Sequence, residues 1–213
     1  MKAAVSQIKK KGFSLALVTD IVKKAKIEPI VFYNRYKNLD EFYDEFVKKY
    51  DYWLRDFVRN NLKELGTPEV YGELLGKLME TLINDAIMAE ILRWEISEGN
   101  HITERTARLR ELHSQEMLDM ASGLEETSRQ DIVAVTAMLV AGIYYLVLHK
   151  DRSPFAGIDL NTEEGRRRVT GACRHVGEML FCKAPVDRER ERIAENLRQQ
   201  GVAEDVIANA LQY

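Results

Sequence analysis

Apolar residues recur at spacings of three and four along nearly the whole chain, which is the pattern of amphipathic helices, and no convincing strand-like alternation is present. The first forty residues predict three short helices. The first extends from Lys2 to Lys11 and stops before Gly12, a residue type that favours the left-handed conformation found after helix ends. The second covers about residues 15–25. The third starts at Pro29, whose missing N–H costs nothing in a first helical turn.

Longer helices are predicted downstream. A fourth begins at Asn38, a good N-cap residue, and extends to about Leu65, a rod of roughly 39 Å at ~1.5 Å per residue. The periodicity then predicts helices over residues 68–82, 84–97, 102–124, 128–150 and 162–183. Two amphipathic pieces separated by Gly201 complete the chain. We therefore expect an all-α protein with a three-helix head (residues 1–46), a larger helical body (47–183) and a C-terminal helical extension (184–213).

The most apolar run extends from Ile132 to Leu148, and Thr136 is its only polar residue. This run is shorter than the ~20 residues that usually span a bilayer. We expect a helix that is buried on all sides within protein. Two arrangements fit this expectation: burial inside one subunit, or burial between two subunits.

Charge is distributed unevenly along the chain. Residues 1–38 contain nine Lys or Arg and two acidic residues, a net charge of +7. Because the whole chain carries −3, residues 39–213 carry −10. A basic head on an acidic body predicts that a polyanion would bind to the head and not to the body. The alternative interpretation is that the basic residues of the head only face solvent and bind no polyanion.

Residue chemistry offers little support for an enzyme. Glu98 and His101 form a Glu-x-x-His pair, but a di-iron bundle needs two such pairs and two further Glu residues. No P-loop, dinucleotide fingerprint or nucleophile elbow is present. We therefore expect no catalytic residue, no metal site and no cofactor.

Cysteine usage and the N-terminus indicate the compartment. Cys173 and Cys182 are nine residues apart, a spacing that fits neither a zinc motif nor a disulfide framework. The stretch MKAAVSQIKKKG lacks the apolar core of a signal peptide. We expect buried or half-buried thiols in a cytoplasmic protein.

Three stretches of the head match a known pattern: AAVSQIKKKGF, VTDIVKKAKI and FYNRYKNLDEF. Through them, residues 3–46 resemble the DNA-binding domain of the tetracycline-repressor (TetR) family of bacterial transcriptional regulators. The resemblance implies a helix-turn-helix head that binds DNA and a helical body that binds a small-molecule effector. It also implies that the protein is a repressor and that effector binding releases it from DNA. Where the family usually has Ser-x-Gly-Thr, this chain has Glu28-Pro29-Ile30-Val31.

A helix-turn-helix places its second helix in the major groove of double-stranded DNA. The residues that read the bases must lie near the N-terminal end of that helix, so we expect Pro29 and Asn34 near base edges, where an Asn amide can pair with adenine. Four residues are expected at phosphates: Lys24, Lys26, Tyr33 and Lys37. Phe32 and Tyr36 are expected in the core, and Arg35 either contacts DNA or pairs with Asp40.

Two heads held about 34 Å apart would bind a palindromic operator far better than one head, so we expect a homodimer. Its interface is expected on the helices at 128–150 and 162–183. The candidate contacts are Ala134, Met138, Ala141, Gly142, Tyr145, Gly171, Arg174 and Glu178.

The resemblance also implies an effector pocket inside the body, with the fourth helix as the lever that resets the spacing of the heads. Apolar and aromatic side chains suit such a pocket. The candidate lining residues are Met79, Ile83, Ile87, Trp94, Met117, Met120 and Tyr144.

Two functions therefore remain open. The first is a dimeric, ligand-responsive transcriptional regulator, which the +7 head favours. The second is a helical ligand-binding or protein-interaction module whose head no longer binds specific DNA, which the Glu28-Pro29-Ile30-Val31 segment favours.

Overall fold

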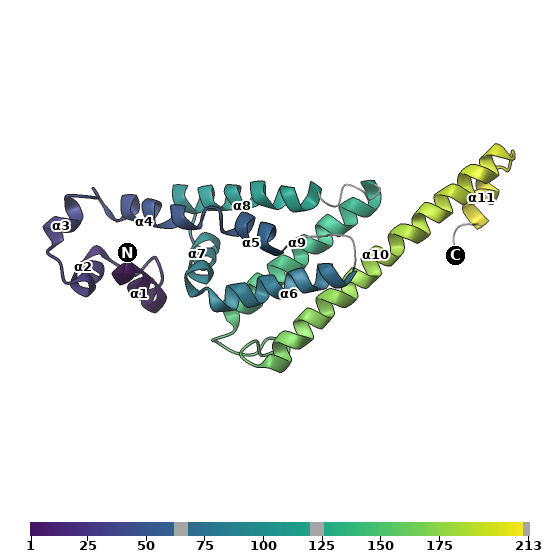
Figure 1. Cartoon of the computed structure of the whole chain (residues 1–213). Helices are drawn as coiled ribbons and strands as arrows, with labels where there is room; N and C mark the ends of the chain where they lie inside the picture. Colours follow the sequence, from purple (N-terminus) through teal and green to yellow (C-terminus); the bar gives the residue numbers. More distant parts are fainter. Residues whose placement is uncertain (62–67, 120–125, 211–213) are drawn as a thin grey trace.

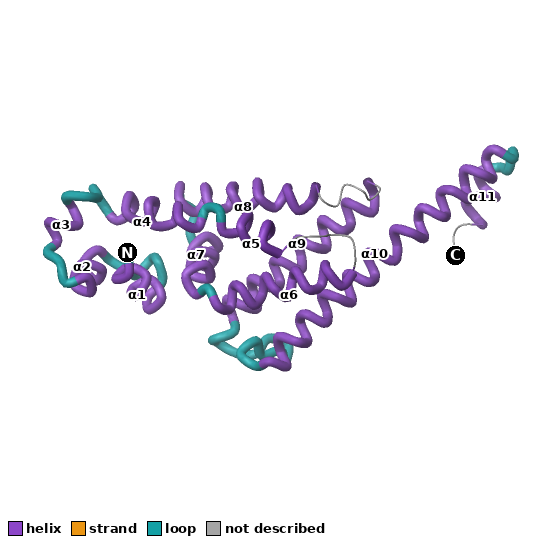
Figure 2. Tube along the Cα trace, in the orientation of Figure 1, coloured by secondary structure: helices purple, strands orange, loops and turns teal. Residues whose placement is uncertain are grey.

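The computed structural model describes residues 1–61, 68–119 and 126–210, and these ranges fold into helices joined by turns and short loops (Figures 1 and 2). Within them, the extended structure is limited to a single bridge between Phe155 and Ile158. The prediction of an all-α fold is confirmed.

The head contains three short helices, α1 (Lys2–Lys11), α2 (Val18–Ala25) and α3 (Pro29–Tyr33). α1 packs on α2, and α2 packs on α3. α1 ends at Gly12 and Pro29 occupies the first turn of α3, as predicted. α2 starts later than predicted, because the Tyr43 hydroxyl donates to the carbonyl oxygens of Phe13 at 3.1 Å and Ala16 at 2.5 Å and holds the preceding loop out of the helix.

The predicted fourth helix of residues 38–65 is not one continuous α-helix. It consists of α4 (Leu39–Val47), a 3₁₀ turn η1 (Lys48–Tyr50) and α5 (Trp53–Asn61). Residues 62–65 of the prediction lie outside the described ranges. Val47, Lys48 and Asp51 all keep right-handed helical dihedrals, so the chain tightens locally without reversing its direction.

The body and extension comprise α6 (Pro68–Asn84), α7 (Ala86–Ser97), α8 (His101–Asp119), α9 (Glu126–His149), α10 (Glu163–Gln199) and α11 (Glu204–Ala210). Figure 1 shows the head at one end of the molecule and the end of α10, with α11, projecting at the other. α6 packs against α7, α9 and α10, and α8 packs against α4, α5 and α7. The predicted end of the helix at 102–124 lies partly outside the described residues.

The contact between α6 and α10 depends on two glycines. A Cβ atom on Gly72 would lie 2.5 Å from Arg174 Cα, and one on Gly76 would lie 2.7 Å from Thr170 Cγ2. Since the two glycines are four residues apart, they share one face of α6 and allow the two helices to approach closely. Arg166 of α10 also pairs with Glu80 of α6 at 3.0 Å.

The helix predicted to end at Lys183 continues to Gln199, so residue 184 is not a boundary between elements. The chain bends at Gly201, which has a φ of 78°, and α11 folds back on α10. Ala194 and Ile207 are buried in this small contact. The predicted break at Gly201 is confirmed.

Burial of α9 on all sides is the prediction that fails most clearly. Ile132, Ile143 and Val147 are buried, whereas Met138 is 71% and Tyr145 49% exposed. α9 contains the one described helical window, Ile132–His149, that is long and apolar enough to cross a membrane, with 17% of it buried. One side of α9 packs on α6, α7 and α10. Its opposite side is an exposed apolar strip.

The close approach of α6 and α10 makes a prediction about stability. We expect Gly72→Ala to lower the free energy of unfolding by about 2 kcal/mol, because an overpacking cost of ~3 kcal/mol outweighs ~1 kcal/mol of helix propensity. Gly99→Ala is the control, since nothing lies within 4 Å of a Cβ at that position. Denaturant titration measures both variants, and equal stabilities would contradict the glycine contact.

Candidate functional site: the basic head, the aromatic junction and the body cavity

The lysines expected at phosphates lie close to the C-terminal ends of α2 and α3. Lys24 belongs to the last turn of α2, Lys26 follows that helix, and Lys37 lies just beyond α3. All three side chains are exposed, as is Lys23. The arrangement gives one end of an acidic chain a cationic edge that is open to solvent.

The helix expected in the groove is only five residues long. Pro29 begins it, and Asn34 follows its last residue, so Asn34 lies at its C-terminal rather than its N-terminal end. Phe32 and Tyr36 are buried, as expected of core residues. The outward face of α3 carries Ile30, Val31 and Tyr33, which are 63%, 52% and 52% exposed.

Arg35 does not pair with Asp40. Its guanidinium contacts Glu45 at 3.0 Å and lies 5.2 Å from the centre of the Tyr36 ring. Both charged side chains are well exposed, so the ion pair contributes less than about 1 kcal/mol to stability. Arg35 can therefore exchange Glu45 for another anion.

The turn after α2 requires an unusual backbone conformation at Lys26. This residue has φ 56° and ψ 44°, in the left-handed region that a side chain disfavours. The Ile27 N–H donates to Val22 O at 3.1 Å and the Lys26 N–H to Lys23 O at 3.3 Å, the hydrogen bonds of a Schellman motif. The lysine therefore occupies a position where glycine would be less strained.

An aromatic cluster joins the head to the body. Phe13, in the loop after α1, stacks on Trp94 of α7 with ring centres 4.5 Å apart and ring planes 7° apart. Tyr43 of α4 meets both rings edge-on, at 5.1 Å and 5.7 Å. Such pairs are each worth about 0.5–1.5 kcal/mol beyond their buried area. We call Phe13, Tyr43 and Trp94 the aromatic junction.

Polar contacts surround the aromatic junction. The Trp94 indole N–H donates to Glu98 at 2.8 Å, and Ser14 of the head donates to the same carboxylate. Glu98 is therefore used at the junction rather than with His101. Burial raises the pKa of Tyr43 well above its ordinary value, so its hydroxyl remains a hydrogen-bond donor at neutral pH.

Arg105 of α8 forms ion pairs with acidic residues in α4 and just after η1. It pairs with Asp44 of α4 and lies 3.5 Å from Asp51. Burial acts to raise the pKa of Asp44, but the hydrogen bonds from Lys48 and Arg105 lower it below its ordinary value. The paired carboxylate therefore stays ionised at neutral pH and ties α4 to α8.

The body contains a cavity of about 410 Å³ between α5, α6, α7, α8 and α9. This volume lies within the usual range of small-molecule sites. Most of its walls are apolar, and the apolar residues are Leu54, Phe57, Leu74, Leu75, Leu78, Ala107, Val133, Ala137, Val140 and Ala141.

The cavity has one buried polar corner. Arg110 pairs there with Glu95, and their side chains are only 13% and 18% exposed. Thr106 donates to the Glu95 carboxylate at 2.9 Å, and Tyr144 lies near Arg110 on the cavity wall. Burial lowers the pKa of Arg110 and raises that of Tyr144, so at neutral pH Arg110 remains charged and Tyr144 neutral.

One of the expected lining residues, Tyr144, lines this cavity. Met79, Ile87 and Trp94 are buried in the hydrophobic core, and Ile83 packs partly buried against it. The side chain of Met117 and the whole of Met120 lie outside the described part of the chain. The sequence did not predict the Glu95–Arg110 ion pair. The only indication of the pair in the sequence is the presence of two charged residues within strongly helical segments.

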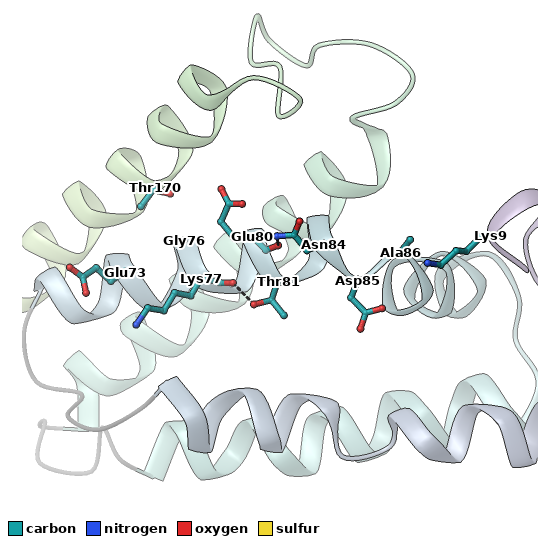
Figure 3. A pocket seen from close by; sticks show the side chains of 10 residues that line it. All are labelled: Lys9, Glu73, Gly76, Lys77, Glu80, Thr81, Asn84, Asp85, Ala86 and Thr170. Carbon is teal, nitrogen blue, oxygen red and sulfur yellow. Dashed lines mark hydrogen bonds between the residues drawn. The ribbon is translucent and has the colours of Figure 1, made fainter. Parts of the chain in front are cut away.

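A larger groove of about 820 Å³ lies along α6, and most of the residues that line it are of polar or charged types (Figure 3). Figure 3 shows Glu73, Lys77 and Glu80 along this helix and Lys9 at the far end. Thr81 donates to Lys77 O at 2.7 Å and Asn84 to Glu80 O at 2.8 Å. Because these polar groups are satisfied within α6, we regard the groove as a solvated helix surface.

The residues expected at a dimer interface are exposed. Ala134, Met138, Ala141, Gly142 and Tyr145 form the apolar strip of α9, and Gly171, Arg174 and Glu178 lie on the neighbouring α10. Arg174 departs partly from this expectation, because its Cα faces Gly72 of its own chain. A groove of about 330 Å³ between α9 and α10 is lined by Met138, Gly142 and Ala172, among others.

Potential metal ligands are scattered. Within the described ranges, no three His, Cys, Asp or Glu side chains gather closely enough to hold a metal ion. Cys173 is buried and free, and its burial raises the pKa of its thiol. The side chain of Cys182 belongs to the undescribed part.

Comparison of the chain with protein-family models, curated proteins and solved structures finds no match.

The strained turn predicts opposite effects of one substitution at two neighbouring lysines. Lys26→Gly relieves a left-handed side chain, so we expect the free energy of unfolding to rise by about 1 kcal/mol. Lys24→Gly, inside α2, should lower it by about 1 kcal/mol. Thermal or denaturant unfolding measures both, and destabilisation by Lys26→Gly would contradict the strain.

Proposed function

We propose that this protein is a DNA-binding transcriptional regulator that acts as a homodimer and responds to a small molecule in the body. The observation that carries the proposal is the cluster of exposed lysines around the α2–α3 turn on a chain that is otherwise acidic. Lysines held on a rigid helical unit suit phosphate contacts, which fix a protein on a duplex. The resemblance of residues 3–46 to the TetR family supports the same function.

Specific base contacts would come from the outward face of α3. Ile30 and Val31 offer apolar contact to thymine methyl groups, and Asn34 offers an amide to adenine. We therefore expect preference for A·T-containing half-sites. Pro29 shapes the start of α3 near the DNA, and Tyr33 can reach a phosphate through its hydroxyl group.

A second copy of the chain is the proposed partner for the apolar strip of α9. A strip with exposed Met138 and Tyr145 is an unfavourable surface in water. Lipid is the less suitable cover, because exposed charged residues such as Arg168 and Glu178 lie on the adjoining α10. A symmetric pair also supplies the two heads that a palindromic operator requires.

Helix α7 provides the proposed connection between cavity and head. Glu95 lines the cavity, and the preceding residue, Trp94, stacks on Phe13 of the head. A ligand that displaces α7 would therefore shift the aromatic junction. Differential affinity of the ligand for two positions of α7 is the physical requirement for release from DNA.

The alternative function, a protein-interaction module, has one specific observation in its favour. Ile30, Val31 and Tyr33 make the outward face of α3 largely apolar, and Glu28 adds an acidic group at its start. Selection of duplexes from a random pool separates the two functions. A regulator enriches palindromic sites, and an interaction module enriches none.

The lysine cluster predicts how duplex binding depends on salt. We expect Lys24→Ala, Lys26→Ala and Lys37→Ala together to weaken binding to all sequences and to make the log–log salt slope shallower by about three. Asn34→Ala is the matched comparison and should relax preference at one base pair, leaving the slope unchanged. An unchanged affinity of the triple variant would remove these lysines from the interface.

The α9 strip predicts the effect of a single charge on association. Met138→Glu should weaken the dimer at least ~100-fold, because the interface would bury an unpaired carboxylate. Leu112→Glu is the control, since Leu112 is 59% exposed on α8. Sedimentation equilibrium measures both. A monomeric unmodified protein, or an intact Met138→Glu dimer, would contradict this interface.

A further inference from the structure

The chemistry of the cavity narrows the class of molecule that it can hold. This inference rests on the proposed function only in assigning the cavity to an effector, because the binding preference follows from the cavity itself. Its walls are predominantly apolar, so most of the ligand must be apolar as well. The polar corner then decides what the remaining part of the ligand is.

Hydrogen-bond donors outnumber acceptors at the polar corner. Arg110 carries five N–H donors. Among the described residues it pairs with the carboxylate of Glu95, which also accepts a hydrogen bond from Thr106. Tyr144 adds a hydroxyl on the same wall. A ligand oxygen that accepts hydrogen bonds therefore complements this corner, whereas a ligand with donors alone does not.

Two other polar residues of the cavity have partners within the protein. Thr136 donates to Ile132 O at 2.6 Å and lies 2.9 Å from the Tyr71 hydroxyl, which must then be the donor of that pair. Ser114 donates to Glu111 O at 2.8 Å. Recognition of a ligand is thus left mainly to Arg110 and Tyr144.

The charges of the cavity select against an anion. The buried charges of Arg110 and Glu95 cancel each other, and Glu111 adds a negative charge at the exposed rim. A carboxylate ligand would place a second negative charge beside Glu95 in an apolar enclosure, where unpaired charge is costly. An ammonium ligand would face Arg110 and bring donors to a corner already rich in them.

We propose that the cavity binds an uncharged, largely apolar molecule that presents a carbonyl or similar acceptor oxygen to Arg110 and Tyr144. Glu95 is the residue that sets this preference, because it neutralises Arg110. Without the charge of Glu95, Arg110 becomes an unpaired buried cation, and a carboxylate becomes the better ligand.

Two compounds of nearly equal shape test the proposal. Benzylacetone is a neutral methyl ketone with a phenyl group at the other end of its chain, and hydrocinnamate replaces its terminal methyl group by a carboxylate oxygen. Ligand-observed NMR titration of the full-length protein to millimolar concentrations gives both affinities. We expect the ketone to bind at least ~10-fold more tightly than the carboxylate. The corresponding primary amine should also bind more weakly than the ketone.

Substitution of Glu95 reverses the expected order. Glu95→Gln keeps the size of the side chain and an oxygen for Thr106, and it should make hydrocinnamate the tighter ligand. Glu104→Gln is the control, because Glu104 is an exposed acidic residue of α8 that does not line the cavity, and it should change the ratio of affinities less than ~3-fold. Circular dichroism establishes whether each variant is folded. If a variant does not fold, the relative affinities of the unmodified protein for the ketone and the carboxylate still test the proposed ligand class.

The possible results separate this inference from the proposed function. Tighter binding of hydrocinnamate or of the amine to the unmodified protein, or no binding of the ketone, would overturn the inference. An unchanged order in folded Glu95→Gln would overturn the role of Glu95. Duplex binding is measured without these compounds, so a protein that prefers the ketone yet binds no DNA would refute the regulator and leave the ligand class standing.

Discussion

The stack of Phe13 on Trp94, closed by Tyr43, is the contact on which the rest of the architecture depends. Through this stack the hydrophobic core of the head packs against that of the body, and the buried side chains form one continuous cluster from α1 to α10. The loop before α2 is held by the Tyr43 hydroxyl, and the orientation of α2 and α3 follows from that loop. The basic surface is therefore fixed relative to the body rather than tethered to it.

This attachment holds the basic head and the acidic body in one defined arrangement. The lysines around the α2–α3 turn project from a rigid base, while the acidic body disfavours approach of a polyanion elsewhere. The same helix that carries Trp94 also carries Glu95 into the cavity. One short helix thus contacts both the cavity and the head, which the proposed ligand-controlled regulator has to connect, and the exposed strip of α9 is the surface proposed for a second copy.

Local signals in the sequence were sufficient for much of the fold. Gly12, Pro29 and Gly201 mark turns by their own backbone preferences, and apolar spacing located the main helices. The interruption after Val47 was not predictable, because its backbone stays helical. The extension of α10 through residue 185 was hidden by a proline that usually ends helices. The polar corner of the cavity was not predictable for a different reason: Glu95 and Arg110 come from separate helices, and only the tertiary structure shows that their charges pair.

Hydrogen–deuterium exchange of the full-length protein, with and without a duplex containing a selected site, tests whether the head binds DNA. We expect slower exchange over residues 20–37, where the lysines and α3 lie, and unchanged exchange along the projecting end of α10. Protection confined to the body, or no protection anywhere at low salt, would contradict a head that is presented to DNA by the aromatic junction.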